Sequence, residues 1–219
     1  MRNVTRAKIP NSLAANAITW TDELLDEIRK MGCFEKVDDL YKNRYRQNDI
    51  KEALIKMYNN HCCYCESLIG DGFATYGRIE HLRPKSIFPQ HCYDWDNMHW
   101  SCEVCNTSYK RARWDTANPI LDPCSDSIPA HLVFDTTTGT YDEIKSSARG
   151  RTTIEHTGLN RDGLTKARRL KLIELATHYR EYKRNGNEDK FIEYYNLIKE
   201  ELDYPSVYDA FLAEIQNTI

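Results

Sequence analysis

Four cysteines in this sequence have the spacing of metal ligands. They form two C-x-x-C pairs, Cys62 with Cys65 and Cys102 with Cys105, and a turn of this length places two thiolates on one cation. Two such pairs complete the tetrahedral thiolate shell of zinc, which is closed to substrate and therefore stabilises a fold. The sequence predicts a structural Zn²⁺ site at these four residues. The alternative, four unrelated buried or redox-active cysteines, requires two C-x-x-C pairs to coincide by chance.

A closed thiolate shell has no position for substrate, so any catalytic residues must lie outside it. The 36 residues between the two pairs carry side chains that could serve. Adjacent Glu80 and His81 offer an oxygen ligand and an imidazole base, and Asn106, directly after Cys105, offers a side-chain carbonyl. These groups suit metal-assisted cleavage of a phosphodiester, because a neutral imidazole accepts a proton near neutral pH. Further polar residues of the same series are Arg83, Lys85, Asn97 and Lys110.

In order, C-x-x-C, Glu-His, Asn, C-x-x-C-Asn and Lys resemble the motif of HNH endonucleases of the ββα-metal class. The resemblance implies that His81 is the general base, and that Glu80 and Asn106 hold a catalytic divalent cation, usually Mg²⁺. It also implies that Asn97 braces the connecting loop. Glu80 stands where Asp is commoner, and Asn106 where many members have His. Because adjacent side chains of a regular strand face opposite ways, Glu80 and His81 serve one ion only if the strand bends, and nearby Pro84 favours a bend.

Several cations accompany the motif. Arg83, Lys85, Lys110, Arg111 and Arg113 could contact phosphates. We expect a nucleic-acid partner, DNA in preference to RNA, although these cations alone do not distinguish the two. The segment from Lys145 to Arg184 adds eleven Lys/Arg against four Asp/Glu, a net charge of +7. A nucleic-acid groove and an ordinary solvated helix face explain that segment equally well.

A narrower resemblance rests on residues 79–86, Ile-Glu-His-Leu-Arg-Pro-Lys-Ser, and on Gly-Leu-Asn at 158–160 before an Arg-rich helix. Both are similar to the HNH subunit of Septu anti-phage systems, which also occurs beside some retrons. This resemblance implies an ABC-type ATPase subunit (PtuA-like) as partner, and a reverse transcriptase with its DNA in the retron form. The sequence contains no G-x-x-x-x-G-K-[ST] loop, so ATP hydrolysis would come from the partner.

A hypothesis from a different class remains open. The same cysteine pairs and basic segment would support a zinc-stabilised nucleic-acid-binding or adaptor module without catalysis. The combination of His81 with Asn106 argues against it, because binding alone needs no base beside a metal ligand. The remaining cysteines and three histidines are expected to be structural or surface groups: Cys33, Cys63, Cys92, Cys124, His61, His91 and His99.

Composition is that of an ordinary soluble domain, with 41% hydrophobic and 29% charged residues and a net charge of −3. No apolar run approaches the ~18 residues that span a bilayer, and the first residues lack a secretory signal, so we expect a cytoplasmic protein. Three regions are expected: a tail and helices at 1–60, the HNH core with its zinc site at 61–115, and a hairpin with helices at 116–219.

Periodicity predicts a mostly α, α+β fold, with the ββα-metal motif flanked by N- and C-terminal helices. Thr21 is the expected N-cap of the first helix and Ser206 opens the last. The expected helices span 20–30, 49–59, 103–113, 163–184 and 191–202, with another after 206. The expected strands are 78–82 and a hairpin at 131–135 and 140–144.

Overall fold

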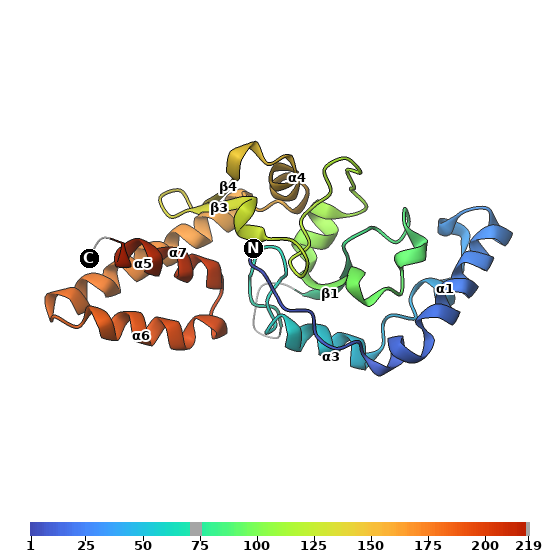
Figure 1. Ribbon diagram of the computed structural model, residues 1–219, viewed down its shortest axis with the longest axis horizontal. Helices are drawn as coiled ribbons and strands as arrows, with labels where there is room; N and C mark the ends of the chain where they lie inside the picture. The colour runs from blue at the N-terminus through green and yellow to red at the C-terminus, as the bar shows by residue number, and fades with distance from the viewer. Residues whose placement is uncertain (71–75, 218–219) are drawn as a thin grey trace.

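Seven α-helices and two antiparallel β-hairpins make up the part of the chain that this computed structural model describes, residues 1–70 and 76–217. The fold is α+β, and helices predominate. Figure 1 shows an elongated molecule with α1 at one end, the first hairpin and α3 in the middle, and α5 to α7 at the other end. The helices are α1 (Asn11–Met31), α2 (Asp39–Lys42), α3 (Asn48–Met57), α4 (Ala148–Thr157), α5 (Asp162–Arg184), α6 (Glu188–Ile198) and α7 (Pro205–Gln216). The strands are β1 (Gly77–His81), β2 (Met98–Cys102), β3 (Leu132–Asp135) and β4 (Thr140–Glu143).

The first hairpin pairs β1 with β2 and leads directly into a short helix, Val104–Lys110. Cys102 ends β2 opposite Gly77, and Glu80 pairs with His99. Only glycine fits at position 77, because a Cβ there would lie 2.0 Å from the Trp100 ring. The short helix is wound with π-type hydrogen bonds, as shown by Arg111 N–H donating to the Asn106 carbonyl at 2.7 Å. Helical turns of this type are rare in proteins, and those that do occur are often found at functional sites.

The N-terminal helix is longer than the sequence predicted. It begins at Asn11, directly after Pro10, and the predicted cap at Thr21 is wrong, because Thr21 lies inside the helix and its hydroxyl donates to the Ala17 carbonyl. Ser12 instead anchors the helix start to α3, since its N–H and hydroxyl both donate to Asp49, at 2.9 and 2.7 Å.

The C-terminal helices confirm most of the periodicity. Helix α5 agrees with the predicted span, and the hairpin β3–β4 lies where it was expected. Ser206 does not cap α7, because it lies inside the helix and donates its hydroxyl to Glu66 at 2.6 Å. Helix α4 and strand β2 were not predicted.

Two hydrophobic clusters form the core. The larger includes the four paired cysteines, β1–β2 and the N-terminal helices, and the smaller joins α5, α6 and α7 around Phe191 and Tyr208. Arg168 lies close to both, 1% exposed, where it donates to the Leu159 carbonyl and lies 4.9 Å from the centre of the Tyr141 ring. None of the helices in the described residues combines the length and the apolar character needed to cross a membrane.

The turn around the first cysteine pair is fastened to a segment near the other end of the chain. Glu66 is buried, and its carboxylate accepts the N–H and hydroxyl of Ser206, while its carbonyl accepts the N–H of Tyr204 at 2.9 Å. Nearby, Leu68 N–H donates to Asp203 at 2.7 Å. Residues about 140 positions apart therefore hold this turn in place.

Candidate functional site

The four paired cysteines meet in one buried cluster. The Sγ atoms of Cys62, Cys65, Cys102 and Cys105 all lie within 4.8 Å of one another, and Cys65 and Cys102 are 3.7 Å apart. The first pair lies in the turn after α3, and the second lies where β2 passes into the short helix. Four buried sulfurs converging on one point are the donor set of a tetrahedral thiolate site, so the residues present fit a zinc ion.

The surroundings of the cluster favour ionisation of Cys65, whereas burial and the neighbouring thiols raise the pKa values of Cys62, Cys102 and Cys105. Arg161 donates to Cys105 Sγ at 3.3 Å, and the Cys105 N–H donates to Cys102 Sγ at 3.4 Å. Hydrogen bonds from the other three thiols lower the pKa of Cys65 well below its usual range, and Arg161 acts in the same direction. Partners of this kind orient metal ligands and offset their negative charge.

The position of Arg161 depends on the turn before α5. Gly158 has φ of +62° and packs against Tyr109, where a Cβ would come within 2.3 Å of the ring. Arg161 donates to the Gly158 carbonyl at 3.0 Å and lies over the Tyr109 ring at 5.6 Å. The glycine thus allows the C-terminal region to bring a cation to the cysteines.

The residues expected to do chemistry line one cavity of about 250 Å³ beside the short helix. Glu80, His81, Lys85, Asn106 and Lys110 all contribute to its wall. Glu80 and His81 are neighbours in sequence but border the same space, at the end of β1 where the strand stops before Pro84. The hairpin and helix therefore bring a carboxylate, an imidazole and an amide together.

Glu80 is ion-paired within this site. Lys110 Nζ lies 2.5 Å from Oε1, and the Tyr64 hydroxyl donates to the same oxygen at 3.3 Å. Lys110 also donates to the His81 carbonyl at 2.7 Å. Burial raises the pKa of Glu80, and Lys110 offsets only part of this effect. Lys110 is thus a buried structural cation and is not free to contact a phosphate.

The His81 ring is held by a carbonyl and an aromatic face. Nε2 lies 2.9 Å from the Cys92 carbonyl, and Tyr45 packs edge-on with its ring centre 4.6 Å away. A carbonyl only accepts, so Nε2 carries the proton and Nδ1 keeps the lone pair. Burial lowers the pKa of His81 to about 3, with a further lowering from Lys85, so the ring is neutral.

Asn97 and Arg83 lie on another side of the loop. Asn97 accepts the Arg83 N–H at 2.7 Å and donates to the carbonyls of Arg83 and His91. Arg83 does not line the cavity of Glu80; its guanidinium contacts His91 at 3.0 Å. Lys85 is committed as well, because its ammonium donates to the Lys42 carbonyl, Asn43 and Tyr45 at 3.0–3.1 Å.

Residues 45–51 form a part of the site that the sequence did not reveal. Tyr45 borders the Glu80 cavity and also a second hollow, of about 280 Å³, which is lined by exposed Arg46, Lys51 and Arg78. No motif marks these residues in sequence, because they precede the first cysteine pair. Only folding places their cations beside the catalytic candidates.

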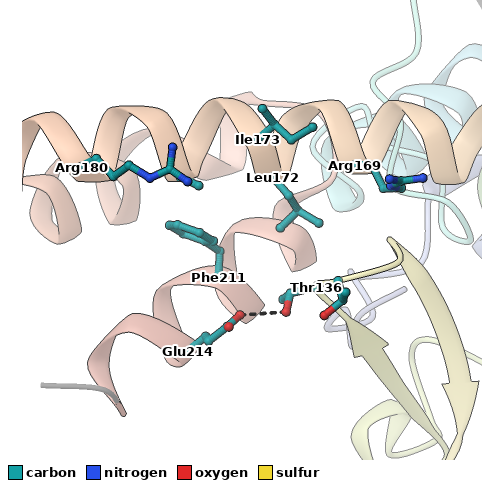
Figure 2. Close-up of a pocket in the computed structure, with 9 residues that line it drawn as sticks. Thr136, Arg169, Leu172, Ile173, Arg180, Phe211 and Glu214 are labelled. Atoms are coloured by element: carbon teal, nitrogen blue, oxygen red, sulfur yellow. Dashed lines mark hydrogen bonds between the residues drawn. The ribbon is translucent and has the colours of Figure 1, made fainter.

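Much of the basic segment 145–184 has structural partners. Arg149 forms a two-pronged pair with Asp126, Arg151 pairs with Glu143, and Arg161 and Arg168 are held as described above. Arg169 and Arg180 line a cavity of about 300 Å³ between α5, α7 and the β3–β4 turn (Figure 2). The +7 charge is therefore not a single free nucleic-acid surface.

The three unassigned histidines are also bonded within the fold. His61 contacts the Leu202 carbonyl at 2.8 Å, His91 contacts Asp94, and fully buried His99 contacts Tyr58 at 2.6 Å. Cys63 and Cys92 are buried outside the four-cysteine cluster.

The fold and site define an α+β protein with a strand–strand–helix unit and a buried four-cysteine cluster. The chain is similar to two curated relatives, both named Septu protein PtuB. The protein from Bacillus mycoides (strain KBAB4) is 29% identical over 171 residues, which are 65% of this chain and 57% of the relative. The protein from Bacillus thuringiensis is 33% identical over 143 residues, 59% of this chain and 52% of the relative. The chain thus spans a little over half the length of these relatives, and no protein-family model matches it.

Proposed function

We propose that this protein is a metal-dependent endonuclease of the HNH, ββα-metal class. The observation that supports the proposal most directly is the single cavity lined by Glu80, His81 and Asn106, beside a strand–strand–helix unit that ends in a four-cysteine cluster. Zinc at the cysteines would fix the helix and β2, and hence the positions of Asn106 and Glu80.

His81 is assigned as the general base. The Cys92 carbonyl fixes the proton on Nε2, so Nδ1 can accept a proton from a water molecule at the scissile phosphate. Tyr45 and Lys85 limit rotation of the ring and of the loop beside it. Proton transfer thus begins from a ring whose orientation and tautomer are set before substrate binds.

Glu80 and Asn106 are assigned as the ligands of a divalent cation such as Mg²⁺. Both contacts to the Glu80 carboxylate involve Oε1, so Oε2 is the oxygen that we assign to the cation. When bound, such a cation supplies charge stabilisation at the phosphate and the leaving oxygen. Lys110 favours the ionised form of Glu80 and orients its carboxylate before the cation arrives.

The nucleic acid is assigned to the surface next to this cavity. Arg46, Lys51 and Arg78 are exposed in the adjoining hollow, and Arg111 borders the cavity of Glu80 itself. Exposed cations of this kind neutralise the backbone phosphates of a nucleic acid, whatever its base sequence. We assign DNA as the substrate in preference to RNA.

The biological role that we propose is that of nuclease component in a Septu-type anti-phage defence system. The similarity to PtuB proteins supports this role, together with the motif resemblance at residues 79–86. The expected partner is an ABC-type ATPase subunit (PtuA-like); a retron reverse transcriptase with its DNA is a further partner in the retron form.

The test is DNA cleavage by the purified protein with Mg²⁺, alone and together with its co-expressed partner. We expect His81→Ala to reduce cleavage at least a hundredfold, as for loss of a general base. His178→Ala is the matched control, because His178 is exposed on α5 and lies outside the cavity. Undiminished cleavage by a folded His81→Ala variant would remove His81 from the proposed role.

One observation favours a second function, an adaptor without catalysis. The ion pair of Glu80 with Lys110 already neutralises the carboxylate without a divalent cation. Titration of the protein with Mn²⁺ separates the two functions. A site abolished by Glu80→Gln supports the nuclease, whereas absence of any such site together with retained DNA binding supports the adaptor.

A further inference from the structure

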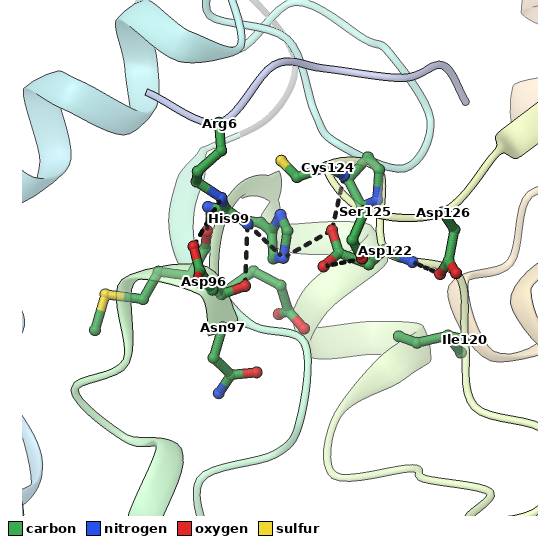
Figure 3. A network of polar contacts seen from close by, with 12 residues as sticks. Arg6, Asp96, Asn97, His99, Ile120, Asp122, Cys124, Ser125 and Asp126 are labelled. Atoms are coloured by element: carbon green, nitrogen blue, oxygen red, sulfur yellow. Dashed lines mark hydrogen bonds and ion pairs between the residues drawn. The ribbon is translucent and has the colours of Figure 1, made fainter. Parts of the chain in front are cut away.

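Three further potential metal ligands converge beside β2. His99 lies on β2, and Asp122 and Cys124 lie in the turn after Leu121 (Figure 3). One ligand atom from each lies within 4.8 Å of the others, and His99 Nε2 is 3.7 Å from Asp122 Oδ1. Nothing in the sequence motif predicts this cluster.

His99 is oriented in the way that metal-binding histidines usually are. Its Nδ1 lies 2.6 Å from the Tyr58 hydroxyl, which lies 3.5 Å from Cys124 Sγ. If Nδ1–H donates a hydrogen bond to Tyr58 and the Tyr58 hydroxyl donates to the sulfur, the lone pair of Nε2 is the one that faces a metal ion. A hydrogen bond at the far ring nitrogen fixes the tautomer of a ligating imidazole.

The Asp122 carboxylate is also held in place. The Cys124 N–H donates to Oδ1 at 2.7 Å, and the Ser125 hydroxyl donates to Oδ2 at 3.0 Å. This turn holds Asp122 and Cys124 in one fixed relationship beside β2. Asp122 and Cys124 border a cavity of about 360 Å³, whose wall includes Asp94 and Asp96 as well as Arg6 and Arg83, so an ion has room beside the cluster.

Arg6 is a cation that lies against the cluster, and Arg83 lines the same cavity. The Arg6 guanidinium lies 3.4 Å from His99 Nε2 but donates more strongly to the Met98 carbonyl at 2.6 Å and the Asp96 carbonyl at 3.0 Å. It also pairs with the Asp96 carboxylate at 3.7 Å. An ion at Nε2 would therefore replace only a long contact, and Arg6 would keep its backbone partners.

We propose that His99, Asp122 and Cys124 form a second zinc site, with a fourth ligand supplied by water or substrate from the cavity. Imidazole, carboxylate and thiolate together suit Zn²⁺ better than Mg²⁺ or Ca²⁺. Three protein ligands with one open position are the arrangement of exchangeable or catalytic zinc. The thiolate and the carboxylate together balance the charge of the ion. The cavity beside this site is distinct from that of Glu80, since the two share no lining residue.

The first test measures zinc per chain in the full-length protein after gel filtration with excess Mg²⁺, which keeps oxygen-ligand sites occupied. We expect Cys124→Ser and Asp122→Asn to retain one zinc fewer than the unaltered protein. Cys33→Ser is the matched control, because Cys33 lies outside both clusters, and it should retain the full content. Equal zinc in the unaltered protein and both site variants would overturn the proposal.

A second test needs no variant and so does not depend on variant folding. Cys124 and Cys33 are both partly exposed, and alkylation of each can be followed by peptide mass spectrometry with and without added Zn²⁺. The proposed site requires zinc to slow alkylation of Cys124 at least tenfold while Cys33 is unaffected. The same rate at Cys124 in both conditions would contradict it.

Discussion

Lys110 Nζ lies 2.5 Å from Glu80 Oε1, with both side chains almost fully buried, 1% and 3% exposed. The two residues are 30 positions apart, one on β1 and the other at the end of the short helix. Their ion pair joins the hairpin to that helix at the edge of the candidate active site. A sequence motif containing both residues could not show that they are partners.

Removal of Lys110 should lower the stability of the protein, because it leaves the buried Glu80 carboxylate without its partner. We expect Lys110→Met to destabilise the protein by about 3–5 kcal/mol. The double variant with Glu80→Gln should recover part of that loss, since no charge is then left unpaired. Chemical denaturation of the unaltered protein, both single variants and the double variant measures the coupling. Two independent, additive losses would show that the ion pair does not join the elements.

Protonation of His81 should make acid destabilise the protein. Its pKa is about 3 in the fold against 6.5 ordinarily, so the unfolded chain takes up a proton first. The contribution of neutral His81 to the free energy of unfolding is full above pH 6.5. It is lost as the pH falls toward about 3, the pKa of His81 in the folded protein. Between about pH 7 and 5.5 the loss is ~1 kcal/mol.

The His81→Asn variant checks this assignment, because its amide can still donate to the Cys92 carbonyl. Denaturation at both pH values should show a smaller acid loss in this variant than in the unaltered protein. His178→Asn, an exposed histidine on α5, should retain the full loss. The zinc ligands are common to all three proteins, so their own acid sensitivity cancels. An identical loss in His81→Asn would refute the link.

Zinc binding should account for a large part of the stability. We expect Cys65→Ser and Cys102→Ser to lower the melting temperature far more than His81→Ala, because structural zinc contributes on the order of 10 kcal/mol in small zinc domains. Cys63→Ala is the sharp control, since Cys63 lies inside the first pair but outside the cluster. It should keep its zinc at Cys62 and Cys65. If Cys63→Ala loses zinc as completely as Cys65→Ser, the ligand assignment is wrong.

The cations beside the candidate active site should govern the DNA affinity that we propose. The double variant Arg46→Ala with Lys51→Ala removes two exposed charges, and we expect the slope of log affinity against log salt to fall by roughly 2. Fluorescence anisotropy at several salt concentrations measures that slope. Lys190→Ala, exposed on α6, should leave it unchanged. An unchanged slope in the double variant would place the nucleic acid elsewhere.

The sequence predicted local features better than distant partnerships. The cysteine pairs, helix α5 and the β3–β4 hairpin follow from spacing and periodicity alone. Strand β2 was missed although Met98–Cys102 alternates apolar and polar residues, because the strand is short and its polar residues, His99 and Ser101, are buried like the others. Helix α4 was missed because threonines and a glycine form its buried face, which hydrophobic periodicity cannot detect.

The charges in the sequence were the poorest guide to the structure, because the sequence does not show which charged side chains are paired in the fold. Lys110, Lys85 and Arg161 read as free cations in a basic sequence, but the fold assigns them to Glu80, to Tyr45 with its neighbours, and to Cys105. Conversely, Arg46 and Lys51 carry no motif and lie beside the site only because residues 45–51 border the hairpin. Such pairings depend on tertiary contacts, which a single sequence does not show.

The bonds between Glu66 and residues 204–206 also bear on how the protein is made. The cysteine turn leaves the ribosome long before Tyr204 and Ser206, so the buried Glu66 carboxylate waits for its hydroxyl and amide partners. Contacts of such long range slow folding. These bonds therefore form in a nascent chain only after residues 204–206 have been synthesised, later than both cysteine pairs.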